Sequence, residues 1–314
     1  MAARQILITG ATGQVAGALA RGLARDNQVI ALARFSEPGS REALEAAGVT
    51  TIFGDFVTGD LDQAPAHVDY VVHCAAHTRP RDSEEAMRIN AEGPGMVMNR
   101  FRTARAFLHV SATGVYVQNP DPRHVYDEDD EIGGGTAFCP LYGASKTAGE
   151  GVVRTLARVL DLPVTIARLN VAYGGPYADG GLPGRQLDAL LSGAPIKLPK
   201  SWSCILAPIH EDDLLAHVVP LLDAASVPAT IVNWGGDEGV PVEDWVRYPG
   251  ELVGRAPNIV HDDEAPWPNW IGNHDKRRAL GCDCKVDWRA GMRRMVAARH
   301  PEVALAPLAE AIGI

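Results

Sequence analysis

Up to about residue 170, short apolar runs alternate with longer stretches in which apolar residues recur every three or four positions. The short runs predict strands at Gln5–Thr9, Gln28–Ala33, Thr51–Phe53, Tyr70–His73, Ala106–Val110 and Val164–Leu169. The longer stretches predict helices at Gln14–Arg25, Arg41–Ala47, Glu84–Arg102 and Tyr142–Leu160. This alternation is typical of βαβ units, in which parallel strands form one sheet with helices on both faces.

The second half of the chain is less regular. Gly and Pro accumulate in "YGGPYADGGLPG", and short elements follow. We expect a dinucleotide-binding core over residues 1–170 and mainly a substrate-binding lobe over residues 171–314, with segments such as "TIVNWGG" returning to the core sheet. The expected fold class is α/β: a doubly wound parallel sheet of the Rossmann type, with a smaller C-terminal lobe over the carboxyl ends of its strands.

Composition and charge argue against nucleic acid, membrane and metal as partners. A chain of 314 residues with 46% hydrophobic residues can bury a large core, and its net charge of −10 disfavours nucleic acid. No apolar run approaches the ~20 residues of a membrane helix, and the first strand leaves no room for a signal peptide. Five scattered cysteines form no disulfide framework, and Cys282-Asp283-Cys284 lacks the second pair that zinc would need. We expect a cytoplasmic protein with a small-molecule substrate, no metal, no nucleic-acid partner and no membrane contact.

A glycine-rich loop connects the first strand to the first helix. Gly10 and Gly13 permit a tight turn and let backbone N–H groups approach a pyrophosphate at the positive helix end. The strand–loop–helix context makes this pattern more specific than the glycines alone. The loop residues expected to bind the cofactor are Gly10, Thr12, Gly13, Gln14 and Val15.

The second strand ends on Arg34, in "VIALARFS", and no acidic residue precedes Glu37. An acid at this place binds the ribose 2′-hydroxyl of NAD, whereas an Arg accommodates the 2′-phosphate of NADP. A guanidinium also matches phosphate geometry in a bidentate manner. The sequence therefore predicts NADP(H) as the preferred cofactor, with NAD(H) as the alternative.

Tyr142 and Lys146, in "LYGASKTAGE", lie four residues apart on a predicted helix and hence on one face. A tyrosine with a pKa near 10 is a poor acid–base group at neutral pH, but a nearby ammonium lowers that pKa. Tyr142 could then exchange a proton with a substrate oxygen during hydride transfer. Lys146 could also hold the nicotinamide ribose. The sequence predicts this pair as catalytic.

Thr9-Gly10-x-x-Gly13, followed by Tyr142-x-x-x-Lys146 after the fifth strand, resembles the short-chain dehydrogenase/reductase superfamily. The length is similar to that of its extended branch, the NAD(P)-dependent epimerase/dehydratase type. The resemblance implies a homodimer through the helices Glu84–Arg102 and Tyr142–Leu160. It also implies a proton-relay role for Asn90 in "RINAEG", which would support the active-site helix.

Further segments extend the resemblance. "GDF" resembles the segment that places an Asp on the adenine amine, "VVHCAA" the strand-four segment whose backbone passes the cofactor, and "ARLNVAYGG" the segment after the sixth strand. For His73 and His210 we favour structural roles, as buried or helix-capping histidines. The cofactor residues that these segments imply are Asp55, Phe56, Cys74, Ala75, Ala76 and Asn170.

The hydroxyl that would contact the substrate oxygen is ambiguous. In "LHVSATGVYV", the position that carries it in the family is Ala112, with Ser111 before it and Thr113 after it. Side chains two apart on a strand face alike, so either could supply the hydroxyl. Thr113 is favoured because it lies nearer the carboxyl end; the alternative is that the donor is missing.

The substrate is not named by the sequence. Nucleotide-sugar members of the family often carry an Arg for the diphosphate where Leu206 stands here, and "PKSWSCIL" before it is mostly uncharged. This favours an oxidoreductase that transfers hydride between NADP(H) and a small, mostly apolar carbonyl/alcohol substrate. The alternative is a nucleotide-sugar epimerase/dehydratase with retained NAD, using Arg168, Arg185 or Lys197. A non-catalytic NADP-binding regulator is the third hypothesis. Stereochemistry and reaction direction stay open.

Overall fold

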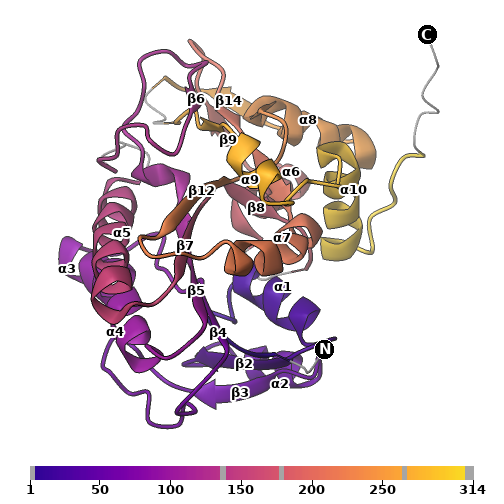
Figure 1. The fold of residues 1–314 in the computed structure, drawn as a ribbon. Coiled ribbons are helices and arrows are strands. Elements are labelled where there is room, and N and C mark those ends of the chain that lie inside the picture. Colours follow the sequence, from indigo (N-terminus) through magenta and orange to yellow (C-terminus); the bar gives the residue numbers. More distant parts are fainter. Residues whose placement is uncertain (1–3, 135–138, 177–179, 264–266, 308–314) are drawn as a thin grey trace.

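A seven-stranded sheet forms the centre of the computed structural model, which describes residues 4–134, 139–176, 180–263 and 267–307. The strand order is β12-β7-β5-β4-β1-β2-β3, and every pair is parallel (Figure 1). The strands are β1 (Gln5–Thr9), β2 (Gln28–Ala33), β3 (Thr50–Phe53), β4 (Tyr70–His73), β5 (Ala106–Ala112), β7 (Val164–Leu169) and β12 (Thr230–Trp234). The doubly wound α/β fold predicted from the sequence is confirmed.

Helices cover both faces of this sheet. Because side chains alternate along a strand, Ile6, Ile8 and Val72 point to one face, whereas Leu7 and Val71 point to the other. The first face packs against α1 (Gln14–Leu23) and α7 (Glu211–Asp223), and the second against α4 (Gly93–Arg100) and α5 (Pro140–Leu160). The short helix α2 (Ser40–Glu45) connects β2 and β3. The strands are thus buried on both sides, as their near-continuous apolar runs indicated.

The helix predicted at Glu84–Arg102 is interrupted. It divides into α3 (Ser83–Met87), the π-helical turn η1 (Arg88–Glu92) and α4. Pro94 has no N–H to give the Asn90 carbonyl four residues earlier, so the regular hydrogen-bond ladder cannot continue there. The break, which places Asn90 inside the widened turn, was not predicted from the apolar pattern.

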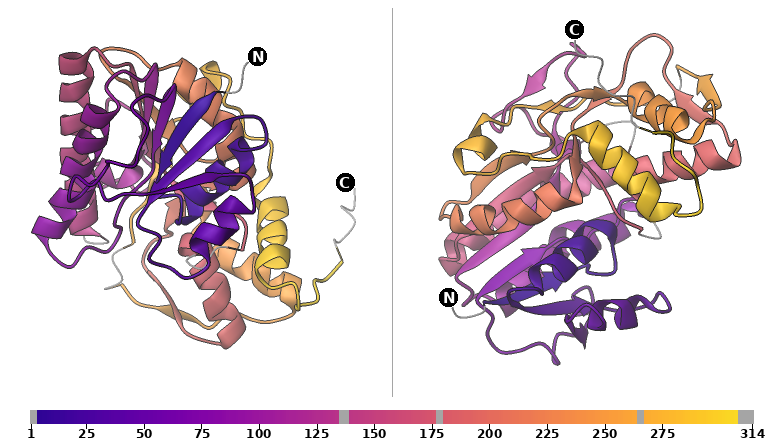
Figure 2. Two further views of the ribbon diagram at one scale, coloured as in Figure 1. Left: turned by 90° about the horizontal axis from the view of Figure 1, so that it is seen from below. Right: turned by 90° about the vertical axis from the view of Figure 1, so that its right-hand side faces the viewer.

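The remaining elements gather beyond one end of the sheet, where α6, α8 and α10 lie together (Figures 1 and 2). Their core includes Trp245, Trp288, Met292 and Val296. The helices are η2 (Thr113–Val115), α6 (Gly181–Ser192), α8 (Val242–Val253), α9 (Asp275–Ala279) and α10 (Trp288–Arg299). The strands form the pairs β6 (Val125–Tyr126) with β15 (Ile271–Gly272), β8 (Val171–Tyr173) with β11 (Pro208–His210), β9 (Ile196–Leu198) with β14 (Ile259–His261), and β10 (Ile205–Leu206) with β13 (Val240–Pro241). We refer to this part as the lobe.

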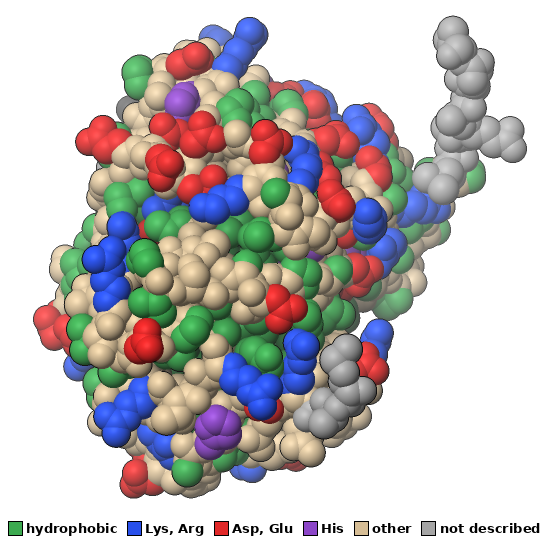
Figure 3. Space-filling view, viewed as in Figure 1, with side chains coloured by type: hydrophobic (Ala, Val, Ile, Leu, Met, Phe, Trp, Pro, Cys, Tyr) green, Lys and Arg blue, Asp and Glu red, His purple; other side chains and the backbone are tan. Residues whose placement is uncertain are grey.

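Acidic side chains gather over the upper part of the face seen in Figure 3, which the lobe occupies, and basic ones are more frequent below. No helix in the described part of the chain is long and apolar enough to cross a bilayer.

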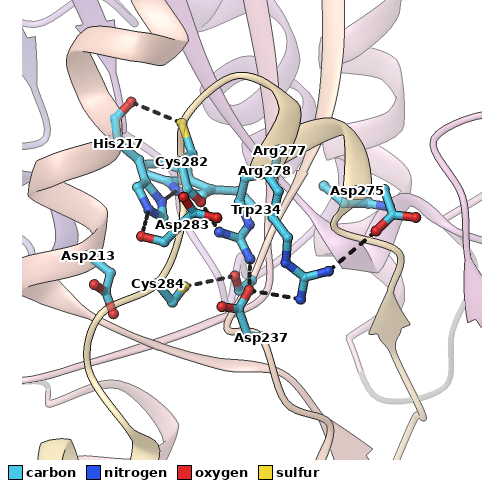
Figure 4. Close-up of polar contacts among 12 residues, drawn as sticks. Asp213, His217, Trp234, Asp237, Asp275, Arg277, Arg278, Cys282, Asp283 and Cys284 are labelled. Carbon is cyan, nitrogen blue, oxygen red and sulfur yellow. Dashed lines mark hydrogen bonds and ion pairs between the residues drawn. The ribbon is translucent and has the colours of Figure 1, made fainter.

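The segment 275–287, here called the strap, returns from the lobe to the core (Figure 4). Arg277 is fully buried and donates to the Cys282 carbonyl and to the Asp237 carboxylate behind β12. The Asp213 carboxylate of α7 accepts from the backbone N–H groups of residues 285 and 286, at 2.8 and 3.2 Å. The ion pair of Arg277 with Asp237 thus ties the strap to the segment after β12. The Asp213 carboxylate ties it to α7.

His217 of α7 adds a third tie to the strap. The Trp234 indole N–H donates to His217 Nδ1 at 3.2 Å, so His217 Nε2 donates to the Asp283 carbonyl at 3.1 Å. The thiols of Cys282 and Cys284 face backbone carbonyls, at 3.9 and 3.8 Å. Across the described ranges, no group of three or more His, Cys, Asp or Glu side chains is placed to hold a metal ion.

Candidate active site

The glycine loop brings β1, α1 and the segment after β4 into contact. Gly10 has a φ of +74°, and a Cβ there would lie 2.8 Å from the Ala75 Cα. Only glycine fits both the left-handed backbone and this close approach. Gly13 donates to the Gly10 carbonyl at 2.9 Å and begins α1, whose first N–H groups have no side-chain cap. A tight backbone cradle at a free helix N-terminus fits a pyrophosphate.

The other expected cofactor residues follow the carboxyl ends of neighbouring strands. Thr12 and Ala76 are exposed, and Gln14, Val15 and Cys74 are half-buried. Gln14 also reaches the lobe, since its amide donates to the Ala172 carbonyl at 3.3 Å. The predicted loop and strand-four segments therefore share one partly open surface.

Arg34 is exposed directly after β2 and makes no hydrogen bond or ion pair with any described residue. Phe35 after it has a φ of +48°, an unfavourable backbone for a bulky residue, and the Arg41 guanidinium lies 5.7 Å from its ring. Such local strain concentrates at functional sites. The Arg34 guanidinium is thus exposed beside a strained turn.

Three predicted cofactor residues make contacts within the protein. Asp55 Oδ1 accepts from the Val57 N–H at 2.9 Å. The Phe56 ring meets His73 edge-on at 5.6 Å and packs against Gly93 of α4. Asn170 donates to the Trp270 carbonyl at 2.8 Å and accepts from the Ala207 N–H at 3.0 Å, so it joins the end of β7 to the lobe.

Tyr142 and Lys146 lie on the first turns of α5, as predicted. Lys146 is only 1% exposed, and its ammonium donates to the Val110 carbonyl at 2.8 Å. Burial lowers the pKa of Lys146 to about 8, although Glu150 and Cys74 act in the opposite direction. The Tyr142 hydroxyl makes no hydrogen bond with any described residue.

The expected effect of Lys146 on Tyr142 is not found in this structure. Burial, and to a smaller degree Cys139, raises the pKa of Tyr142 above its ordinary value of 10. Lys146 is not among the causes of this shift, and its ammonium donates to the Val110 carbonyl instead. In this state Tyr142 is a protonated phenol at neutral pH.

Asn90 supports α5 through its side chain. Its Oδ1 accepts from the His77 N–H at 2.8 Å, and its Nδ2 donates to Ser145 Oγ at 3.0 Å. Ser145 in turn donates to the Tyr142 carbonyl at 3.0 Å. A Cβ on Gly149 would collide with the Asn90 carbonyl oxygen, so η1 and α5 touch backbone to backbone.

Ser111 and Thr113 differ in their surroundings. Ser111 donates to the Glu150 carboxylate at 2.7 Å, which commits its proton. The strand ends at Ala112 and the turn η2 begins at Thr113, so strand alternation does not extend to Thr113. The two side chains were expected to face alike because the strand was assumed to continue. Thr113 is 5% exposed and makes no hydrogen bond with a described residue.

Residues 6–235 match the sequence model of the NAD dependent epimerase/dehydratase family. The chain belongs to this family. The match extends from β1 to the residue after β12 and thus includes the glycine loop, Tyr142 and Lys146. The recognition of the extended short-chain dehydrogenase/reductase superfamily from the sequence is confirmed.

Solved structures share the fold over nearly the whole chain. The UDP-glucose 4-epimerase of Thermus thermophilus, in complex with NAD, is 21% identical with a TM-score of 0.80, covering 95% of this chain and 100% of that one. The UDP-glucuronic acid 4-epimerase from Bacillus cereus, with UDP-glucuronic acid and NAD, is 19% identical with a TM-score of 0.78, covering 95% and 99%. At such identities the likeness establishes the fold.

A curated relative is similar over part of the chain. The hybrid PKS-NRPS synthetase tasS of Hapsidospora irregularis is 30% identical over 176 residues, which are 52% of this chain. The chain spans only 4% of the length of that relative.

Within the epimerase/dehydratase fold lies a buried polar network that was not predicted from the sequence. Arg168, one of three residues that a nucleotide-sugar enzyme could use for the diphosphate, is 2% exposed and donates to both Glu150 oxygens, at 3.0 and 2.9 Å. It also donates to the Tyr116 hydroxyl at 3.0 Å and to the Glu128 carbonyl at 2.8 Å. The signal was present, because Glu150 follows Lys146 by one helical turn and so shares its buried face.

The lobe residues that bear on substrate class are also accounted for. Leu206 is buried in the lobe core. Lys197, another of the residues named for the alternative, nucleotide-sugar substrate, is paired with Asp262 at 3.0 Å on the surface. His210 caps α7 by accepting from the Asp212 N–H at 3.1 Å, so the structural role favoured for it is confirmed.

Proposed function

We propose that the protein is an NAD-dependent epimerase or dehydratase that takes hydride from a hydroxyl-bearing carbon of a nucleotide-linked sugar and returns it to the same molecule. The observation that carries this proposal is the family match over residues 6–235, which includes both the glycine cradle and the Tyr142–Lys146 helix. The similar solved structures, whose names include UDP-sugars and NAD, support the substrate class by fold analogy.

In this reaction, separate residues bind the cofactor and transfer the proton. The backbone at Gly10 and Gly13 holds the pyrophosphate against the N-terminus of α1. When bound, the nicotinamide supplies the hydride acceptor and donor. Tyr142 exchanges the proton of the substrate hydroxyl, because its own hydroxyl bonds to no described residue and it shares α5 with Lys146.

Tyr142 must become a phenolate to accept that proton. Burial opposes this change, so nearby positive charge has to favour it. Lys146 supplies such a charge if its ammonium turns from Val110 toward the phenol. Thr113, whose hydroxyl bonds to no described residue, steadies the substrate oxygen, while Ser111 stays bonded to Glu150.

A second candidate function retains the NADP(H)-dependent oxidoreductase acting on a small, mostly apolar carbonyl/alcohol. Arg168 and Lys197 are engaged within the protein, and Leu206 is apolar, which favours a substrate without a diphosphate. Arg34, which is exposed and pairs with no described residue, favours a 2′-phosphate and hence NADP(H). A nucleotide-binding regulator would share the cofactor site without Tyr142-dependent turnover.

The test is to denature freshly purified protein and identify any released nicotinamide nucleotide by mass spectrometry. About one NAD per chain would support internal return of hydride, because such an enzyme keeps its cofactor. An empty site, or partial NADP(H), would contradict it and favour the oxidoreductase; NADPH and NADH would then be titrated against wild type and Arg34→Ala. Gly10→Val is the matched control, because its side chain would fill the cradle against Ala75 and prevent retention.

A further inference from the structure

Two histidines lie buried side by side behind the active-site helix. His73 of β4 and His109 of β5 are neighbours in the strand register, and both are 0% exposed. Their rings stack at 5.7 Å with an interplanar angle of 15°. Both side chains point to the face covered by η1, α4 and α5, as does Phe107, whose ring lies 6.0 Å from that of His73.

Three ring nitrogens of this pair have no partner among the described residues: His73 Nε2, His109 Nδ1 and His109 Nε2. Buried polar atoms nearly always bond to protein or to ordered water. The remaining atom, His73 Nδ1, bonds to Thr9 Oγ1 at 2.8 Å. In either tautomer, therefore, His73 lacks one partner and His109 lacks both a donor and an acceptor.

The surrounding charges decide what could fill these positions. Burial lowers the pKa of His73 to about 3 and that of His109 well below its ordinary value, and Lys146 adds to both shifts. Both rings are hence neutral at physiological pH. His109 offers one donor and one acceptor, whereas His73 offers only Nε2, because its Nδ1 bonds to Thr9. Two imidazoles beside an ammonium form a poor site for a metal cation, because the like charge repels it. Their complementary partner is a small neutral molecule that both donates and accepts.

We propose that His73 and His109 hold ordered water between the sheet and α5, and that this water solvates Lys146. The three ring nitrogens that lack a partner among the described residues supply its anchors. The water site and its effect on Lys146 do not depend on the proposed function.

The groups that face Lys146 come from three elements. Glu150 and Tyr142 lie one turn away on its own helix, Cys74 follows β4, and the two histidines lie on the sheet. The carboxylate of Glu150 is the main group that stabilises the ammonium by charge, and that carboxylate is shared with Arg168 and Ser111. Water anchored on His109 would therefore matter for the ionisation of Lys146.

The experiment combines a crystal structure at high resolution with an NMR titration of isotope-labelled lysine, using Lys146→Met to assign the Lys146 signal. Wild type is compared with His109→Phe, which keeps a flat ring but removes both nitrogens, and with His109→Gln, which keeps a donor and an acceptor. We expect water bonded to His109 in the wild type. The Lys146 pKa should fall by about one unit in His109→Phe, because the ammonium loses its solvation, and change much less in His109→Gln.

A dry wild-type site, or an unchanged Lys146 titration in His109→Phe, would overturn the proposal. A dry site would also let His109→Phe stabilise the protein, since it would replace two unsatisfied polar atoms by apolar ones. Neither readout uses substrate or turnover, so failure here is distinguishable from failure of the proposed epimerase/dehydratase function.

Discussion

Lys146 is a buried charge that costs the protein stability. Its pKa is about 8 in the folded protein against an ordinary value of 10.5, so the folded state binds the proton less tightly than the unfolded chain. The buried charge therefore destabilises the protein below pH 8, and this penalty fades as the pH rises from 8 to 10.5. A site that costs stability in this way is typical of catalysis.

Lys146→Met should remove that penalty. At pH 7 we expect the free energy of unfolding to rise by about 1–2 kcal/mol, and at pH 10 to change little. Denaturant melts at the two pH values measure this, with the exposed Lys276→Met as the control. An equal gain at both pH values would mean that packing, rather than the charge, is responsible.

Tyr142→Phe tests the acid–base role at the same scale. Once a substrate is identified, kcat should fall by about 10²–10⁴-fold, because only the proton-transfer group is lost. The content of bound nucleotide should stay unchanged. Tyr248→Phe, on α8 of the lobe, is the matched control. Full activity in Tyr142→Phe would remove this residue from the mechanism.

Single residues could be predicted where the pattern that identifies them spans only a few positions of the chain. The glycine loop, Arg34 and the Tyr142–Lys146 spacing are such patterns. The glycine loop follows β1 and Arg34 follows β2, and these two strands are adjacent in the sheet. The partners of Ser111 and Arg168 could not be predicted, because Glu150 reaches them across a sheet–helix interface. Long-range contacts of buried polar groups leave little trace in a single sequence.

At the scale of elements, the contact of α5 with η1 brings two backbones together. Gly149 and Gly151 lie two apart on α5, yet only Gly149 faces the Asn90 carbonyl; a Cβ on Gly151 would meet open space. Replacing each glycine by alanine therefore adds the same methyl group at a crowded position and at an open one.

Gly149→Ala should destabilise the protein by about 2–4 kcal/mol, because α5 must move away from η1. Gly151→Ala should stabilise it by about 0.5–1 kcal/mol, because alanine is the better helix former and nothing obstructs it. Thermal or denaturant unfolding of the two variants checks this. Similar behaviour of both would contradict the close packing of the two helices.

The pattern of the sequence predicted the strands of the central sheet better than the strands of the lobe. The predicted β1, β2, β4 and β7 have the observed bounds, and β3 and β5 differ only at one end. The π-helical turn was missed because it depends on Pro94 and on the fit of Gly149 against Asn90. The paired strands of the lobe have two or three residues each, too few for a period to be recognised.

At the scale of the whole molecule, the expected homodimer through α4 and α5 stays a prediction. Met96 of α4 and Val159 of α5 are 45% and 71% exposed, which leaves apolar surface on both helices. Light scattering coupled to size exclusion should give a dimer for wild type. Met96→Glu and Val159→Glu should shift it toward monomer, because each would bury a charge at the interface.

The control for the dimer is Val260→Glu, which changes an exposed apolar residue of β14 in the lobe. It should leave the mass unchanged. A wild-type monomer, or dimers that tolerate both substitutions on α4 and α5, would show that the resemblance does not extend to assembly.

The strap limits how this protein could be rebuilt. The buried Arg277 depends on Asp237 for its charge partner, and Asp213 of α7 holds the strap where it leads into α10. A chimera that took its lobe from another protein, with a junction before residue 287, would separate Arg277 from Asp237 and the strap from Asp213. Recombination with other family members should therefore exchange α7, β12 and the strap as one unit, which makes substrate range harder to swap than the linear order of the chain suggests.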